Sequence, residues 1–182
     1  MGIIDNALTR ALEIAADDSH GYDQSNRWGP DYDCSSLVID CFKRAGLPLS
    51  CTYTGNMRGD MMRCGFEDVT GSVRLATGAG LERGDVLLNH VHHTALYIGG
   101  GQLVQASINE YGTVTGGQTG DQTGRELSTQ KWYLHKKGWR VFRAVKREQA
   151  LKIAADMEAA CKNSHIGYDQ WQRNTLYKAA EP

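Results

Sequence analysis

Cys34 is the residue of this sequence best suited to nucleophilic chemistry. It stands at the predicted start of a helix over residues 34–45, which Gly46 and Pro48 bring to an end. A helix N-terminus and a neighbouring imidazolium lower the pKa of a thiol from about 8.5 by several units, and the thiolate can attack an amide carbonyl. Cys41 lies two turns further on, on the apolar side of the same helix, so we expect it to be a buried structural cysteine.

Three histidines, His90, His92 and His93, lie close together just before a predicted strand. Neighbouring side chains of a strand point to opposite faces, so His92 and His93 cannot face the same partner. Three histidines on one extended strand also cannot converge on a metal ion, and no carboxylate motif completes a ligand set. We therefore expect no metal ion at these histidines, and no cofactor is expected for the chain.

Two segments resemble motifs of the papain-like NlpC-type cysteine peptidases, a family of peptidoglycan hydrolases. The first, DYDCSSLVIDCFKRAGLPL, is similar to the start of the family's catalytic helix, and the second, ERGDVLLNHVHHTALYIGGGQLVQAS, is similar to the strands that follow it. The resemblance implies Cys34 as the nucleophile and His93 as its base. It places Gln105 at the position that orients the imidazole, where a histidine is more usual and where an amide can serve, as an asparagine does in papain-like sites.

The same resemblance implies further roles around Cys34. Tyr22 matches a family tyrosine that lines the oxyanion and substrate side, with the backbone N–H of Cys34 as a second oxyanion donor. Asp33 and Ser35 match positions that contact the free amine of short stem peptides. The glycine-rich loop at 112–124 resembles an insertion in wall-degrading enzymes of phages and prophages, and we expect it to border the substrate groove rather than to be a loose connector.

The elements that must position these residues form an α+β pattern. Apolar residues at helical spacing predict an amphipathic helix over residues 3–15, ahead of the helix at 34–45. Runs of β type follow at 85–88, 94–98, 102–107 and 139–145, with a glycine turn at 99–101 that indicates a hairpin. With the resemblance, this pattern predicts the papain-like NlpC-type fold, in which N-terminal helices pack on a central antiparallel β-sheet.

The chain is predicted to divide into a catalytic NlpC-type domain at residues 1–146 and a helical C-terminal segment at residues 147–182. Within that segment ALKIAADMEAACK echoes ALEIAAD near the N-terminus, and SHIGYDQ echoes SHGYDQ. Two interpretations fit the echo. The stretches are two similar surface helices, or a second, related module begins near residue 150 and is cut short at Pro182.

Composition disfavours several other classes of protein. Twenty basic residues against 21 acidic give a net charge of -1, so no general attraction to nucleic acid or to an anionic membrane is expected. Five cysteines without a Cys-x-x-Cys pair indicate neither a disulfide framework nor a zinc ribbon. Without a signal peptide or a long apolar stretch, we expect synthesis in the bacterial cytoplasm, no membrane insertion, and action on the cell wall after release, with a holin as the releasing partner.

The expected function is hydrolysis of an amide bond in bacterial peptidoglycan by acyl transfer through Cys34. The pattern GPDYDCSS is closest to endolysin amidases of phages and prophages of Gram-positive hosts, which favours the N-acetylmuramoyl-L-alanine bond. A stem-peptide endopeptidase of the γ-D-glutamyl type is the alternative. More distant alternatives are a transferase on the same fold and a non-catalytic wall-binding module.

Overall fold

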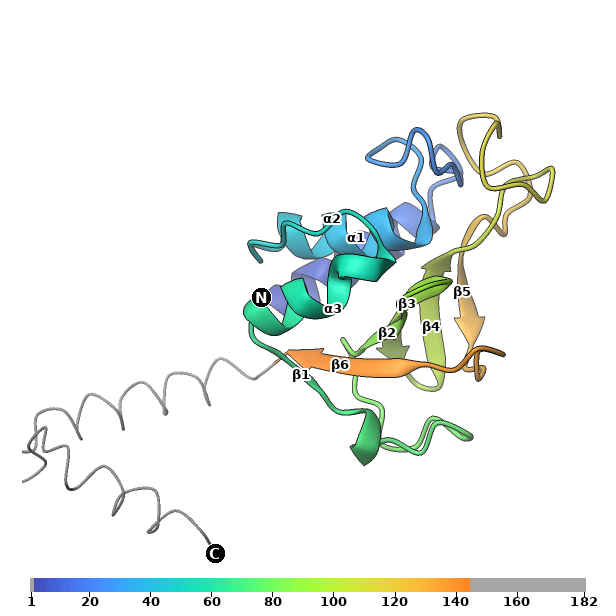
Figure 1. The fold of residues 1–182 in the computed structure, drawn as a ribbon. Coiled ribbons are helices and arrows are strands. Elements are labelled where there is room, and N and C mark those ends of the chain that lie inside the picture. Colours follow the sequence, from blue (N-terminus) through green and yellow to red (C-terminus); the bar gives the residue numbers. More distant parts are fainter. Residues whose placement is uncertain (1, 145–182) are drawn as a thin grey trace, which may run out of the picture. The chain divides into compact units, whose positions relative to one another are not determined.

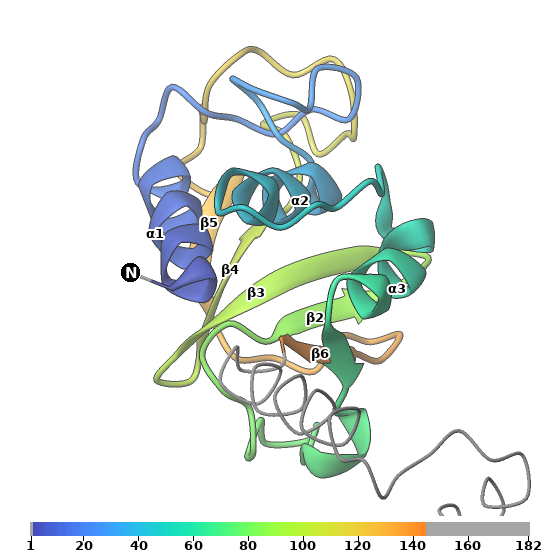
Figure 2. The same ribbon diagram turned by 90° about the vertical axis from the view of Figure 1, so that its left-hand side faces the viewer.

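The computed structural model describes residues 2–144, and the predicted segment at 147–182 lies outside the described residues. The described part of the chain forms three α-helices, a short 3-10 helix and six β-strands (Figures 1 and 2). The helices are α1 (Ile3–Ala15), α2 (Cys34–Arg44), α3 (Thr54–Arg63) and η1 (Thr70–Ser72). The strands are β1 (Phe66–Asp68), β2 (Val86–Asn89), β3 (His93–Gly99), β4 (Gln102–Ala106), β5 (Leu127–Lys131) and β6 (Arg140–Ala144). None of these helices is long and apolar enough to cross a membrane.

The strands form one antiparallel sheet in the order β1-β6-β2-β3-β4-β5. The strands that carry His93 and Gln105, β3 and β4, are therefore hydrogen-bonded neighbours. The turn between them contains Gly99, Gly100 and Gly101, with φ angles of 94°, 61° and 72° that side-chain-bearing residues rarely adopt. The hairpin predicted at this turn is confirmed.

The three helices cover one face of the sheet (Figure 1). Successive side chains of a strand point to opposite faces, and the two faces carry separate apolar clusters. The cluster under the helices includes the strand residues Val86, Leu88, Leu96, Val104 and Phe142. The opposite face carries Leu87, Ala95, Leu103, Val141 and, from a loop, Trp139. Because α2 packs on β3, the site residues of the helix and of the strand are held by the same core.

The α+β class and the packing of helices on an antiparallel sheet, predicted from the sequence, are confirmed. The predicted β runs correspond to β2, β3, β4 and β6, whereas α3, β1 and β5 were not predicted. Two glycines weaken the helical signal of α3, which buries only Met57 and Met61. β5 is an edge strand of mostly polar residues, buried fully at Leu127 alone, so its sequence lacks the alternation typical of a strand.

Candidate active site

Cys34 is the first residue of α2, and Asp33 caps this helix. The backbone N–H of Ser36 donates to the Asp33 carboxylate at 2.6 Å, and the backbone N–H of Asp33 donates to the Ser36 hydroxyl at 2.9 Å. This reciprocal capping box fixes the direction in which the chain enters the helix. It therefore fixes the position of Cys34, which is 7% exposed.

The thiol of Cys34 lies against β3 and is strongly desolvated. Burial raises its pKa to about 12, and the charge of Asp33 acts in the same direction, whereas hydrogen bonds from backbone groups of Thr94, Ser35 and Cys34 act against it. The expected lowering of the thiol pKa by the helix N-terminus is thus outweighed by burial. The resting nucleophile is a neutral thiol, so it needs a base at the moment of attack.

His93 and Gln105 are joined directly. Nε2 of His93 lies 2.9 Å from Oε1 of Gln105, and the hydroxyl of Tyr133 donates to the same oxygen at 2.8 Å. Because Oε1 can only accept, Nε2 of His93 carries the proton and Nδ1 is left as the basic atom of the ring. Sequence reasoning did not single out Tyr133, which lies in the connection between β5 and β6.

The structure connects Cys34 and His93 through β3 and not through a hydrogen bond of their own. The backbone of Thr94, the residue after His93, contacts the thiol. Within residues 2–144 no hydrogen bond joins Cys34 to the imidazole. Catalytic hydrogen bonds are often long in the absence of substrate and tighten in the substrate complex, so the arrangement suits a nucleophile and its base.

Aromatic rings from the β5–β6 connection surround the imidazole of His93. The ring of His135 stacks on it at 6.1 Å between centroids, and the ring of Trp139 lies at 5.9 Å. Nε1 of Trp139 donates to the carbonyl oxygen of Tyr133 at 3.0 Å, which ties the two ends of this connection together. Burial lowers the pKa of His93 below its ordinary 6.5, against a raising effect of the Gln105 hydrogen bond, so the imidazole is neutral at neutral pH.

Tyr22 is buried next to the nucleophile. Burial raises the pKa of its phenol, and the charge of Cys34 acts in the same direction because the two groups are close. The Tyr22 hydroxyl accepts a hydrogen bond from the Gln24 amide at 3.2 Å, which leaves its own proton for another acceptor.

The backbone N–H of Tyr22 donates to the Glu126 carboxylate at 2.9 Å. Glu126 is completely buried and also accepts from the backbone N–H of Gln122 at 3.1 Å, a role that sequence reasoning missed.

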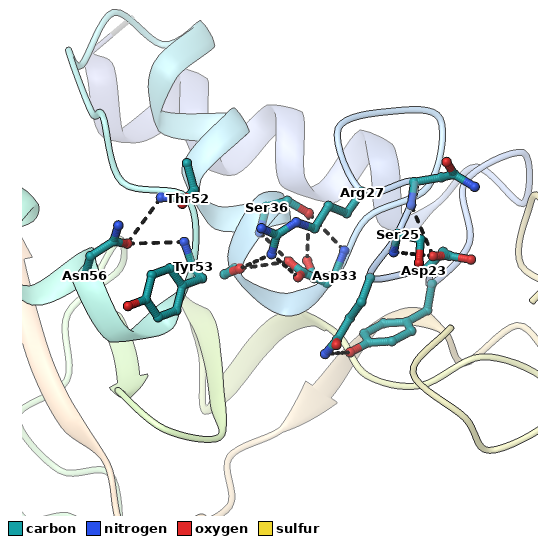
Figure 3. A network of polar contacts seen from close by, with 12 residues as sticks. Asp23, Ser25, Arg27, Asp33, Ser36, Thr52, Tyr53 and Asn56 are labelled. Carbon is teal, nitrogen blue, oxygen red and sulfur yellow. Dashed lines mark hydrogen bonds and ion pairs between the residues drawn. The ribbon is translucent and has the colours of Figure 1, made fainter. Parts of the chain in front are cut away.

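Asp33 and Ser35, expected to contact a substrate amine, lie inside the protein at 3% and 2% exposure. The Ser35 hydroxyl donates to one Asp33 carboxylate oxygen at 2.8 Å. The Arg27 guanidinium donates to the other at 2.6 Å, as Figure 3 shows. Both oxygens of the Asp33 carboxylate thus have protein donors, and contact of Asp33 and Ser35 with a substrate amine stays a prediction.

The glycine-rich loop at 112–124 docks on the segment that leads to Cys34. The backbone N–H of Gln24 donates to the carbonyl oxygen of Val114 at 2.9 Å. One oxygen of Asp31 accepts from the backbone N–H groups of both Gly21 and Gly120, at 2.8 and 2.9 Å. A Cβ on Gly21 would lie 2.1 Å from the carbonyl oxygen of Gly120, so only glycine allows this approach. The loop is thus a fixed neighbour of the Tyr22 segment.

The remaining residues considered from the sequence stay outside this arrangement. Cys41 is fully buried in the apolar core, and His92 is exposed, with its ring stacked on His135 at 6.3 Å. In the described part of the chain, no three His, Cys, Asp or Glu side chains are grouped so that they could hold a metal ion.

The comparison with protein families identifies the family of the chain. A family model described as the endolysin-like domain matches residues 29–104 and residues 103–182, which together span most of the chain. The chain belongs to the endolysin-like domain family. No match is found among curated protein sequences.

Solved protein structures resemble the fold of this chain. A variant of the resuscitation promoting factor interacting protein RipA, mutated at a cysteine, is 18% identical, with a TM-score of 0.50 over 79% of this chain and 63% of its own. The peptidoglycan hydrolase RipB from Mycobacterium tuberculosis is 19% identical, with a TM-score of 0.47 over 79% of this chain and 65% of its own. The chain thus spans less than two thirds of these proteins. The predicted NlpC-type family and fold are confirmed, and at these identities the likeness to the structures is one of fold alone.

Proposed function

We propose that the chain is a cysteine hydrolase of bacterial peptidoglycan in which Cys34 is the nucleophile and His93 its base. The observation that carries the proposal is the pair of hydrogen bonds on Oε1 of Gln105, from His93 and Tyr133. They fix the imidazole in the tautomer with a free Nδ1, on the strand whose Thr94 backbone contacts the thiol of Cys34 at the N-terminus of α2. Membership of the endolysin-like domain family supports peptidoglycan as the substrate.

The first half of the proposed reaction acylates Cys34. As the sulfur attacks the carbonyl carbon, Nδ1 of His93 takes the thiol proton, and the carbonyl π electrons move onto the oxygen. The Tyr22 hydroxyl and the backbone N–H of Cys34 stabilise this oxyanion. When the tetrahedral intermediate collapses, the carbon–nitrogen bond breaks, and His93 returns the proton to the departing amine.

The second half releases the acyl group. Nδ1 of His93 takes a proton from a water molecule, whose oxygen attacks the thioester carbonyl. Collapse of the second tetrahedral intermediate breaks the carbon–sulfur bond, and the proton on His93 returns to Cys34. Gln105 stabilises the imidazolium form of His93 only through a neutral amide oxygen. A carboxylate at this position would stabilise it more strongly.

The bond that we propose is the amide between N-acetylmuramic acid and L-alanine. It is supported by the string GPDYDCSS, which resembles phage endolysin amidases. The same resemblance supports the proposed setting, in which the protein is made in a bacterial cytoplasm and reaches the wall after release, with a holin as partner.

The test is mass spectrometry of fragments released from purified peptidoglycan by the chain and by its Cys34→Ala variant. The expected products are stem peptides with a free L-alanine amine, and the variant should bind the wall but release none. Cys64→Ala is the matched control, because Cys64 is half-buried and lies outside the site. Cleavage within the stem peptide would identify an endopeptidase instead, and unchanged release by Cys34→Ala would refute cysteine catalysis.

A further inference from the structure

Arg27 lies beside the catalytic helix and is the one residue that brings a positive charge to the Asp33 carboxylate in the described structure. Nη1 of its guanidinium donates to Asp33 at 2.6 Å (Figure 3). The same nitrogen approaches the hydroxyl of Ser35 at 3.5 Å. The side chain of Asp33 is 4% exposed and that of Arg27 is 23% exposed. Of the two charged groups, the guanidinium is therefore the one that solvent, or a substrate, can reach.

Both oxygens of the Asp33 carboxylate already have protein donors. One oxygen accepts from the Ser36 backbone N–H and from the Ser35 hydroxyl, and the other accepts from Arg27. A buried carboxylate without such partners would attract a substrate cation. Here its charge is neutralised within the protein, and an ammonium that displaced Arg27 would leave the guanidinium partly buried and unpaired.

Arg27 has N–H groups that make no hydrogen bond within residues 2–144. A guanidinium has five N–H donors, and within residues 2–144 all hydrogen bonds from Arg27 come from Nη1. The ring of Trp28 lies 5.6 Å from the guanidinium carbon, in the range of a cation–π contact that holds the group in place. The positive charge of Arg27 also acts on the phenol of Tyr22, next to the nucleophile. The guanidinium thus presents free N–H groups close to the reacting centre.

We propose that Arg27 determines specificity: the subsite beside Cys34 takes a substrate oxygen that accepts hydrogen bonds, and it disfavours a free α-ammonium. This inference rests on the proposed function and deepens it. Stem peptides still attached to muramic acid offer ether and carbonyl oxygens at this end, whereas released stem peptides offer an ammonium. The site should therefore bind muramoyl peptides and discriminate against free ones.

Binding to the Cys34→Ala variant tests the inference without depending on which bond is cut. The probes are N-acetylmuramoyl-L-Ala-D-isoglutamine and the dipeptide L-Ala-D-isoglutamine, whose N-terminus is free, measured by calorimetry. We expect the muramoyl peptide to bind at least about tenfold more tightly, the effect of one charge-assisted hydrogen bond. Because the sugar adds contacts of its own, N-acetyl-L-Ala-D-isoglutamine serves as a third probe and should also bind more tightly than the free dipeptide. Equal binding of the acetylated and free dipeptides would overturn the inference.

Substitution of Arg27 shows whether this residue is the cause. Arg27→Gln in the Cys34→Ala background should reduce the preference for the acetylated dipeptide about tenfold or more, whereas Arg27→Lys should keep most of it. Arg44→Gln is the matched control, because Arg44 pairs with Asp40 at 2.7 Å on the exposed side of the same helix. An unchanged preference in Arg27→Gln would overturn the role of Arg27. If the unaltered chain released no fragments from peptidoglycan, the proposed function itself would be refuted.

Discussion

Gln105 holds His93 in one tautomer by accepting a hydrogen bond from Nε2 at 2.9 Å. The two residues lie on neighbouring strands of one hairpin, so the rigid β3–β4 ladder sets their spacing. A histidine is more usual at this position in the family that the sequence resembles. An amide oxygen serves the same purpose here, because it can only accept and so places the proton on Nε2.

Replacement of Gln105 by Glu should move the acid limb of the pH–rate profile to higher pH. A carboxylate next to the ring favours the imidazolium and raises the pKa of His93, by about 1–3 units for a charge at this distance. Gln105→Leu, which cannot orient the ring, should lower kcat at all pH values. The measurement is the pH dependence of kcat for both variants, and an acid limb that stays in place in Gln105→Glu would contradict the assigned contact.

Tyr133→Phe should lower kcat about 2- to 13-fold with little change in KM, the effect of one hydrogen bond of about 0.5–1.5 kcal/mol. The variant removes the donor at 2.8 Å that fixes the Gln105 amide, and Tyr133 acts as a positioning residue through Gln105. Without this donor the Gln105 amide can rotate away from His93, so the acid limb of the pH–rate profile should also shift in this variant. Tyr97→Phe is the control, since the Tyr97 hydroxyl accepts from Gly101 at the far end of the hairpin. Equal effects of the two substitutions would indicate general destabilisation instead.

Tyr22→Phe should lower kcat by about 10²-fold, as loss of one oxyanion donor does in acyl-transfer enzymes. The hydroxyl of Tyr22 accepts from Gln24, so its proton is free to meet an oxyanion formed at Cys34. KM should change little, because the contact forms in the transition state. A variant with unchanged kcat would show that Tyr22 only packs against the site.

Short motifs made much of the site predictable from the sequence. Cys34, His93 and Gln105 lie in two continuous segments, and their strands and helix follow from local patterns of apolar residues. Their partners were not predictable. Tyr133 contacts Gln105 across 28 residues, and Glu126 contacts Tyr22 across 104 residues, so only the folded path of the chain brings them together.

The pKa of Cys34 could not be predicted from the sequence for a similar reason. The helix N-terminus that lowers a thiol pKa is visible in the local pattern of residues 34–45. The opposing burial depends on how the folded chain packs around the start of α2, and it is the larger effect. Arg27 is a comparable case: it stands only six residues before Asp33, but its ion pair depends on how the loop folds back on the helix.

Glu126→Gln should destabilise the protein and displace Tyr22. The carboxylate accepts from the backbone N–H groups of Tyr22 and Gln122 with its two oxygens, and a glutamine offers only one acceptor. A buried donor left without a partner costs about 1–3 kcal/mol of unfolding free energy. Thermal or urea unfolding measures this loss, and kcat should fall in the folded variant. Glu110→Gln, on the adjacent loop, is the control, and a stable Glu126→Gln variant with full activity would contradict the role.

The pH–rate profile of the unaltered chain should be broad. Burial lowers the pKa of His93 below 6.5, so the base becomes protonated, and activity falls, only at pH values below that. Burial raises the pKa of Cys34 to about 12, which moves the basic limb well above the value of about 8.5 of an ordinary thiol. Chelators should have no effect on a reaction carried by this pair.

The rate of alkylation by iodoacetamide gives an independent measure of the ionisation of the Cys34 thiol. The thiolate is the reactive form, so labelling of Cys34, located by peptide mapping, should be slow at neutral pH and should accelerate steadily as the pH rises. Half-buried Cys64 provides an internal reference in the same sample. A Cys34 labelling rate that is fast and constant between about pH 5 and pH 8 would show a preformed thiolate–imidazolium pair. That result would require His93 to be charged in the resting site, contrary to the neutral imidazole that its burial favours.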